Sequence, residues 1–399
     1  MPAHHPPLTR RQCLLHLVAG TTTLLGCGGG GRSSTPPAPD GELIEGMRVV
    51  TVAEGLQHPW GLAFLPDGRL LFTERAGTMR TVQPDGSGLS SPIAGLPAVV
   101  VAGQGGLLDV ALDPDFANTP WIYWSYVESG GASTAGTAVA RGQLVGNTMT
   151  GVTVLYRQIP KVTGDGHFGG RLAFAPDGRL LITLGERMLE DPAAPGTLYA
   201  QNLGNSLGKV VRLERDGNIP PDNPNLGGGA LPELFSFGLR NPQGAAIHPS
   251  TGELWVADHG PQGGDEINVI QAGDNHGWPL VSYGCPYGSP VGNACWVNGG
   301  THAPNYVEPL TTWTPTSTAP SGMAFYTGSR YPSWTGQLFV GALAGEALWR
   351  LTLSGNTVTS RTAMFVNRLG RIRDVRQGRD GWLYLLTDET NGRILRLEM

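Results

Sequence analysis

A single histidine stands in a glycine-rich part of the chain. The segment TGDGHFGGRLAF, residues 163–174, surrounds His167 with four glycines. An unperturbed histidine titrates near pH ~6.5, so it can act as a general base at neutral pH. The flanking glycines would let a substrate and a cofactor approach the backbone closely. His167 is therefore a candidate site residue, and these residue types alone leave its role open.

The residues that follow His167 repeat an earlier part of the chain. LAFLPDGRLLFT at 62–73 is nearly identical to LAFAPDGRLLIT at 172–183. The first copy follows QHPWG, which contains His58, and the second follows GDGHFGGR. We interpret the shared twelve residues as scaffold, a hairpin with an Asp-Gly turn. His167 is then a functional insertion on a repeated structural theme, and His58 has no assigned role.

Three arginines could hold an anion. Arg240, Arg371 and Arg373 stand in a chain of which only 15% of the residues are charged. Arg371 and Arg373 are two residues apart on a predicted strand, so both point to one face. Guanidinium groups suit carboxylates and phosphates. Each arginine alone could instead pair with Asp or Glu between structural units, but together with a histidine they favour a small polyanion.

A glycine-proline turn could hold a cation. The segment HGPQGGDE, residues 259–266, contains no cluster of carboxylates, but such turns expose backbone carbonyl oxygens. Ca²⁺ accepts oxygen ligands of that kind. The alternative is a simple turn capped by Asp265.

A repeated unit positions these residues. It consists of a short apolar strand, a turn, a second strand, a glycine-containing turn and a third strand, without any 3.6-residue period that would indicate helices. The unit starts near Gly61, Gly106, Gly170, Gly244, Gly322 and Asp374. Six such units predict an all-β fold, a six-bladed β-propeller. We expect residues 47–56, MRVVTVAEGL, to add the outer strand of the last blade and close the ring. A two-domain β-sandwich is the alternative.

The polar candidates lie at the boundaries of these units, and a propeller would bring them to one end of its central channel. They are Gln104, His167, Arg240, Asn241, Arg371 and Arg373.

The N-terminus has the pattern of an export signal. Arg10 and Arg11 precede an apolar stretch that ends in LLGC at Cys27, the form of a bacterial lipoprotein cleavage site, and TRRQCLL also resembles a twin-arginine motif. A plain secretory signal is the alternative. We predict a signal peptide over 1–26, a flexible tether over 27–46 and the propeller over 47–399. The protein would be periplasmic or anchored to the outer membrane, with a lipid as its only membrane attachment.

Composition and the remaining cysteines narrow the possibilities further. The net charge of the 399 residues is -5, and without a long basic run this gives no support to nucleic-acid binding. In an exported chain Cys285 and Cys295 are expected to form a disulfide that closes a loop. A metal site at these cysteines is the weaker alternative, since no His or further Cys flanks them at ligand spacing.

The chain resembles a known family, the bacterial soluble quinoprotein aldose and glucose dehydrogenases. The resemblance runs from about Val49 to Leu397. It rests on GQGGLL, HFGGRLAFAPDG, LGKVVRL, GLRNPQG, HGPQGGDEINVI, GDNHGWP, APSGMAFY and RIRDV followed by DGWLYLLTD, in that order. It implies a six-bladed propeller that uses pyrroloquinoline quinone (PQQ) and Ca²⁺. The implied reaction oxidises an aldose at C1 to the lactone and passes electrons to an external acceptor.

The resemblance also implies roles for single residues. His167 would be the catalytic base, with Asp265 a supporting carboxylate near it. The carbonyl oxygens of Gly260 and Pro261 would bind Ca²⁺. The implied quinone ligands are Gln104, Arg240, Asn241, Arg371 and Arg373. The three carboxylates of PQQ would account for several arginines in a chain of low charge.

Three positions depart from the glucose dehydrogenase branch. Ala344 replaces a lysine that binds the quinone, Gly166 replaces an aspartate before the histidine, and Glu186 replaces an aspartate after the third unit's strand. Glu186 can still orient His167; the alternative is a surface salt bridge with Arg187. The missing lysine favours the broader aldose dehydrogenase branch. It also motivates a second hypothesis, a propeller that binds a sugar or protein without turnover. A third is a metal-dependent lactonase on the same fold, which would need Asp, Glu and Asn side chains around one Ca²⁺.

Overall fold

The computed structural model describes residues 46–194 and 196–399. In that part of the chain the secondary structure consists of strands β1 to β23 and two short 3₁₀ helices, η1 (Asn293–Cys295) and η2 (Pro332–Trp334). The prediction that helix is scarce is confirmed. No helix in these residues is long and apolar enough to cross a membrane. The predicted signal peptide, Cys27 and nearly all of the tether lie outside the described residues and stay predictions.

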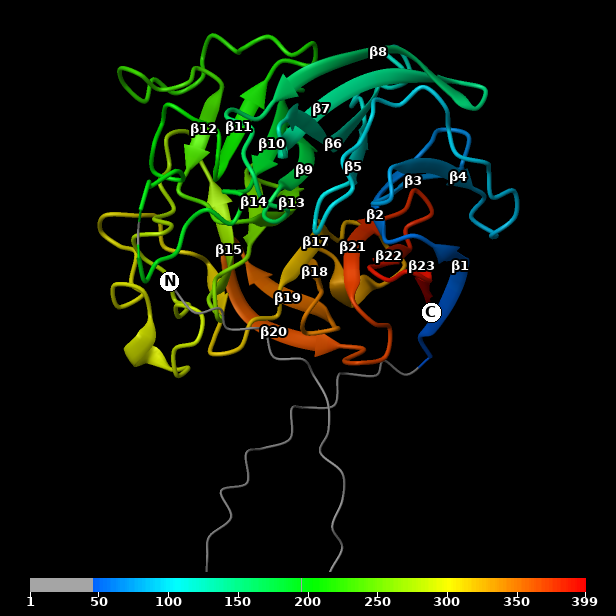
Figure 1. Ribbon diagram of the computed structural model, residues 1–399. Helices are drawn as coiled ribbons and strands as arrows, with labels where there is room; N and C mark the ends of the chain where they lie inside the picture. The colour runs from blue at the N-terminus through cyan, green and yellow to red at the C-terminus, as the bar shows by residue number, and fades with distance from the viewer. Residues whose placement is uncertain (1–45, 195) are drawn as a thin grey trace, which may run out of the picture. The chain divides into compact units, whose positions relative to one another are not determined.

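The strands form six antiparallel sheets arranged in a ring (Figure 1). The strands nearest the middle are β2 (Pro59–Phe64), β5 (Leu107–Leu112), β9 (Gly169–Phe174), β13 (Pro242–Ile247), β17 (Pro320–Phe325) and β21 (Ile372–Gln377). Blade one continues from β2 with β3 (Leu70–Glu74) and β4 (Thr78–Val82). Blade two continues from β5 with β6 (Ile122–Gly131), β7 (Thr134–Val145) and β8 (Thr148–Arg157). Blade three continues from β9 with β10 (Leu180–Leu184), β11 (Lys209–Leu213) and β12 (Leu234–Phe237). Blade four continues from β13 with β14 (Leu254–Asp258), β15 (Asp265–Ile270) and β16 (Thr311–Trp313). Blade five continues from β17 with β18 (Leu338–Ala342), β19 (Leu348–Ser354) and β20 (Thr357–Met364). Blade six continues from β21 with β22 (Leu383–Thr387), β23 (Gly392–Glu398) and β1 (Arg48–Leu56).

The innermost strands make the ring continuous. They contact one another in chain order, from β2 to β5, β9, β13, β17 and β21, and β21 contacts β2 again. Each coincides with the start of one predicted repeat. The predicted six-bladed propeller is confirmed and the β-sandwich alternative is wrong. Among the described residues, five sheets have four strands and the first has three, so the repeat was predicted one strand short in most blades.

The N-terminal strand closes the ring as predicted. β1 pairs antiparallel with β23, from Arg48 opposite Glu398 to Leu56 opposite Gly392. Val52 and Leu56 of this strand are buried in a cluster that also contains side chains of blades one and six. The two ends of the described chain are thus held in one sheet.

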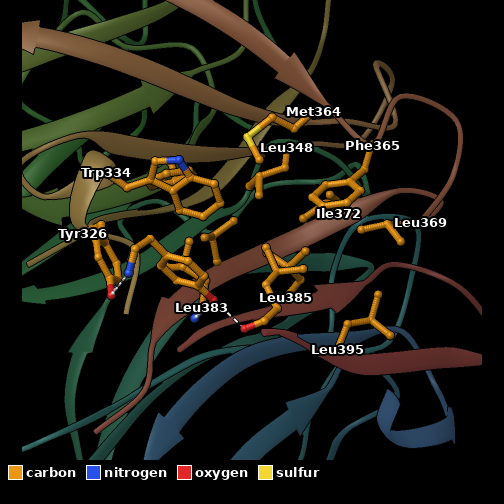
Figure 2. Close-up of a cluster of buried hydrophobic side chains, with 14 residues drawn as sticks. Tyr326, Trp334, Leu348, Met364, Phe365, Leu369, Ile372, Leu383, Leu385 and Leu395 are labelled. Carbon is orange, nitrogen blue, oxygen red and sulfur yellow. Dashed lines mark hydrogen bonds between the residues drawn. The ribbon is translucent and has the colours of Figure 1, made fainter. Parts of the chain in front are cut away.

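Apolar packing between blades orients β21, the strand that follows Arg371 and contains Arg373. Ile372 lies in a buried cluster with Leu348, Leu385 and other side chains of blades five and six (Figure 2). Because side chains alternate along a strand, Arg373 points to the side opposite Ile372, toward blade one. The guanidinium carbon of Arg373 lies 5.5 Å from the ring centre of Trp60, which confirms that direction. Arg371, which precedes the strand, reaches the Leu343 carbonyl of blade five.

A buried ionic cluster joins the inner strands. Arg171 of β9 is 1% exposed, and its guanidinium lies 3.0 Å from Asp374 of β21 and 3.4 Å from Asp109 of β5. It also donates to the carbonyls of Gln243 (2.8 Å) and Arg373 (2.7 Å), and it stacks on Trp60. This one side chain therefore connects five blades of the propeller.

Candidate active site

Six of the predicted site residues precede or begin an innermost strand. Gln104 comes before β5, His167 before β9, and Arg240 and Asn241 before β13. Arg371 immediately precedes β21, and Arg373 is its second residue. The same end of four of the six innermost strands therefore contributes, and a hydrogen bond joins two of these residues, His167 and Gln104, directly.

His167 is buried and held from several directions. It is 4% exposed and has a left-handed backbone, with φ of 46°. Its N–H donates to Gln104 Oε1 at 2.9 Å, and its ring Nδ1 hydrogen-bonds Glu186 Oε1. Gly185 makes this close approach possible, because a Cβ there would stand 2.2 Å from the His167 carbonyl oxygen. Gln104 and Glu186 thus fix both the backbone and the ring of the histidine.

Glu186 is a fully buried partner of the histidine. Its second oxygen accepts the N–H groups of Leu189 (2.6 Å) and Glu190 (3.1 Å), and its own N–H donates to the Arg240 carbonyl at 2.9 Å. Arg187 donates to the backbone carbonyls of residues 135, 164 and 166 instead. The alternative of a surface salt bridge between Glu186 and Arg187 is therefore wrong.

The environment keeps His167 in its basic form. Burial, followed by the charges of Arg240 and Arg187, holds the pKa of His167 well below its usual value. Burial raises the pKa of Glu186 to about 7, although Arg240 opposes this rise. The two backbone donors on Glu186 favour its carboxylate, which accepts the Nδ1 proton of His167. Nε2 is then left as the atom that can take a proton.

The arginines are fixed by neighbouring oxygens. Arg240 donates from Nη1 to the Gly260 carbonyl (2.8 Å) and from Nη2 to the hydroxyl of Tyr287 (3.1 Å). Arg373 donates from Nη2 to Asp388 Oδ2 at 2.6 Å. Arg371 is 44% exposed and its Nη2 lies 3.7 Å from the same oxygen. Arg371 is the arginine that most openly faces solvent in this group.

A chain of hydrogen bonds links these candidates across the blades. The Asn241 Oδ1 accepts the N–H of Gly169 (3.3 Å) and Nε2 of Gln243 (3.1 Å), and Gln243 Oε1 accepts Nη1 of Arg373 (2.8 Å). Sequence reasoning missed Gln243 and Asp388. Gln243 stands in GLRNPQG and Asp388 ends DGWLYLLTD, two of the motifs that carried the resemblance, and that position was the available signal.

Asp265 belongs to the glycine-proline turn. Its Oδ1 accepts the Gly260 N–H at 2.9 Å, and its Oδ2 accepts the Ser317 hydroxyl and the N–H groups of Thr318 and Ala319 at 2.6 to 2.8 Å. No hydrogen bond joins it to His167 in the described part of the chain. The expected position of Asp265 beside the histidine is therefore corrected. Four donors from the turn and the 317–319 loop occupy its oxygens, and Glu186 is the carboxylate at the histidine.

The same turn presents the predicted metal ligands. A Cβ at residue 260 would stand 2.3 Å from the Gly263 carbonyl oxygen, so the turn closes only with glycine at that position. Within the described residues, no three His, Cys, Asp or Glu side chains are arranged to hold a metal ion. The carbonyl oxygens of Gly260 and Pro261 therefore stay the candidate ligands, and that of Gly260 already accepts Arg240.

Comparison with known proteins agrees with this arrangement. The sequence model of the Glucose / Sorbosone dehydrogenase family matches residues 56–396. The chain belongs to this family. It is 44% identical over 356 residues to aldose sugar dehydrogenase YliI of Escherichia coli strain K12, which covers 88% of this chain and 92% of that protein.

Two solved structures of aldose sugar dehydrogenases are similar to this member of the family. The soluble enzyme from Escherichia coli in its apo-form has a TM-score of 0.81 at 42% identity, covering 88% of this chain and 99% of that one. The PQQ-bound form from Streptomyces coelicolor has a TM-score of 0.70 at 30% identity, covering 88% and 98%. The resemblance inferred from the motifs is confirmed.

The structure of this dehydrogenase locates two of the departures. A Cβ on Gly166 would stand 2.2 Å from the sulfur of the exposed Met188, so a larger residue there requires this flexible side chain to move. Ala344 lies in a turn where its N–H donates to the Thr318 carbonyl at 3.1 Å. Arg371 donates to the adjacent Leu343 carbonyl at 3.1 Å, so a positive charge still reaches this turn.

The disulfide loop of the dehydrogenase is docked on the glycine-proline turn. Cys285 and Cys295 are bonded to each other, which confirms the prediction and makes a metal site at these cysteines wrong. Gln262 and Cys285 exchange two backbone hydrogen bonds of 3.0 Å, and Gln262 Nε2 donates to the Ser289 carbonyl at 2.7 Å. The loop that carries Tyr287 is therefore fixed beside Arg240.

Proposed function

We propose that this protein is a PQQ- and Ca²⁺-dependent dehydrogenase that oxidises aldose sugars at C1 to the lactone. The observation that carries the proposal is the buried His167–Glu186 pair, hydrogen-bonded to Gln104 and connected through backbone contacts to Arg240. A neutral imidazole with a fixed Nδ1 proton is a competent base for a sugar hydroxyl. Family membership and the PQQ-bound relative favour the same chemistry.

The residues present fit an anionic quinone and a cation. The side chain of Arg371 is 44% exposed, and buried Nε atoms of Arg240 and Arg373 have no hydrogen-bond partner among the described residues. These three arginines, with Gln104 and Asn241, would hold the carboxylates and carbonyls of PQQ. The carbonyl oxygens of Gly260 and Pro261 would bind Ca²⁺. When bound, PQQ supplies the two-electron oxidant for the C1 hydride, and Ca²⁺ a Lewis acid beside it.

The protein's own residues handle the proton. His167 Nε2 takes the proton of the anomeric hydroxyl while C1 loses its hydride, so that the C1–O bond becomes a carbonyl and the product is the lactone. Glu186 keeps the ring oriented and stabilises the imidazolium that forms. The electrons then pass to an external acceptor. Export through the predicted lipoprotein signal would place the reaction outside the cytoplasm.

The test is reconstitution of the purified protein. Aldose-dependent reduction of a dye should appear only after PQQ and Ca²⁺ are added. The His167→Ala variant should still bind PQQ but lose turnover by about 10²-fold or more, the usual scale for loss of a general base. If no aldose reduces the dye in the presence of PQQ, the proposed function is wrong; if the variant keeps full turnover, the base is another group.

A further inference from the structure

His58 occupies in blade one the position that His167 occupies in blade three. Each precedes the innermost strand of a nearly identical segment, β2 for His58 and β9 for His167. Both have left-handed backbones, with φ of 50° and 46°. Each ring Nδ1 bonds a buried carboxylate, Asp388 Oδ1 at 2.8 Å for His58 and Glu186 for His167. Left-handed non-glycine residues are uncommon and collect at functional sites.

The two pairs differ in what the carboxylate holds. The second oxygen of Glu186 accepts backbone N–H groups of its own blade, whereas the second oxygen of Asp388 interacts with the arginines. Its Oδ2 accepts Arg373 Nη2 at 2.6 Å and lies 3.7 Å from Arg371 Nη2, while its N–H donates to the Arg371 carbonyl at 2.8 Å. One carboxylate oxygen therefore belongs to the histidine and the other to the arginine pair.

The charges around Asp388 keep it ionised. Burial alone would raise the pKa of Asp388, but the charge of Arg373, hydrogen bonds from Arg373 and His58, and the nearby Arg75 together hold it well below its usual range. The His58 backbone also ties the two blades together. Its N–H donates to the Glu389 carbonyl (2.9 Å), and its carbonyl accepts the Arg75 N–H (3.0 Å). His58 is thus fixed against the one carboxylate that the arginines share.

We propose that His58 is a positioning residue for the anion-binding arginines. Guanidinium and carboxylate groups prefer to pair through two parallel hydrogen bonds. By occupying Oδ1, His58 restricts Asp388 to a single bond with Arg373, which leaves N–H groups of Arg371 and Arg373 for the carboxylates of a ligand. Without His58, Asp388 would turn both oxygens to the arginines and compete with that ligand. This inference rests on the proposed function, because the ligand it concerns is PQQ.

The experiment compares His58→Ala with His58→Asn. Asparagine tolerates the left-handed backbone, and its amide N–H can stand in for Nδ1–H, so it serves as the matched control. PQQ is titrated into each apoprotein in the presence of Ca²⁺ and binding is followed by quenching of protein fluorescence. We expect the Kd to rise about 10-fold in His58→Ala, the scale of one charge-assisted hydrogen bond, and to change by less than about 3-fold in His58→Asn.

A second measurement on the apoprotein separates positioning from a general structural effect. Phenylglyoxal modifies accessible arginines, and peptide mass spectrometry reports the rate at Arg371. The rate should fall by about 3-fold or more in His58→Ala, because Asp388 then engages this arginine, and should stay unchanged in His58→Asn. Normal PQQ binding and normal Arg371 reactivity in His58→Ala would overturn this inference alone. A wild-type protein that binds no PQQ would overturn the proposed function and this inference together.

Discussion

The protonation of the His167–Glu186 pair determines when the base is available. Since the pKa of Glu186 is raised to about 7 and that of His167 is lowered, the pair gains one proton as the pH falls through about 7. That proton removes the carboxylate acceptor of the Nδ1–H group, or occupies the base itself. Either way the pair no longer accepts a proton from the sugar, and activity should be lost toward acid pH.

Glu186→Gln tests this assignment. The amide oxygen can still accept the Nδ1 proton, but the side chain no longer titrates. We expect the acid limb of kcat/KM to lie near pH 7 in the wild type and to move to lower pH in the variant, where His167 itself protonates. The plateau should fall by about 10-fold, because no charge stabilises the imidazolium. Profiles of kcat/KM from about pH 5 to pH 9 are measured for both proteins. If the acid limb of the variant does not move, a group other than Glu186 titrates in it.

The sequence predicted which strand ends contribute residues, but not every contact between them. His167, Arg240 and Arg371 could be placed because each stands at the same point of a repeat. Both Glu186 and Asp265 were predicted to lie beside His167. The folded structure shows that the 317–319 loop binds Asp265, which leaves Glu186 as the partner of the histidine. The contact of Gly166 with Met188 joins residues of two separate loops, so no local pattern could reveal it.

At the scale of the elements, the inner strands were predictable and the outer strands were not. The second strands of blades three and four, β10 and β14, are wholly buried, and their sequences are largely apolar. The outer strand β20, TVTSRTAM, is largely exposed or half-buried and rich in threonine, so it lacks the apolar pattern by which strands are recognised. The fourth strand of blade five was missed for this reason.

Two arginines of blade three should respond very differently to the same substitution. Arg171 is buried among Asp109, Asp374 and Trp60, whereas Arg179 pairs with Asp177 in the exposed hairpin turn. Arg171→Met removes one of the two arginines that neutralise the buried Asp109 and Asp374, and should lower the free energy of unfolding by about 3–5 kcal/mol. Arg179→Met is the matched control and should change it little.

Urea denaturation of both variants measures the difference. A small effect of Arg171→Met would mean that Arg376, which lies 2.8 Å from both Asp109 and Asp374, suffices to neutralise these carboxylates. The inner ring would then depend on apolar packing rather than on the ionic cluster.

At the scale of the whole molecule, the ring depends on a strand from the far end of the sequence. β1 covers β23, the strand that would otherwise be the exposed edge of blade six, and unpaired edges invite aggregation. A lone blade cannot bury both faces but six in a ring can, and the repeats predicted that such a ring leaves one gap to close. The apolar segment before the first unit was the available candidate.

Removal of this strand should open the propeller at blade six. A chain starting at residue 57 loses β1, whereas a chain starting at residue 47 keeps it and serves as the control. Buried Val52 and Leu56 each contribute about 1.5–3 kcal/mol, so the shorter chain should lose about 3–6 kcal/mol of unfolding free energy. It should also bind PQQ more weakly, because blade six carries Arg371, Arg373 and Asp388. Urea midpoints and PQQ titrations of the two chains compare these effects, and equal values would show that the last blade is held by its inner strands alone.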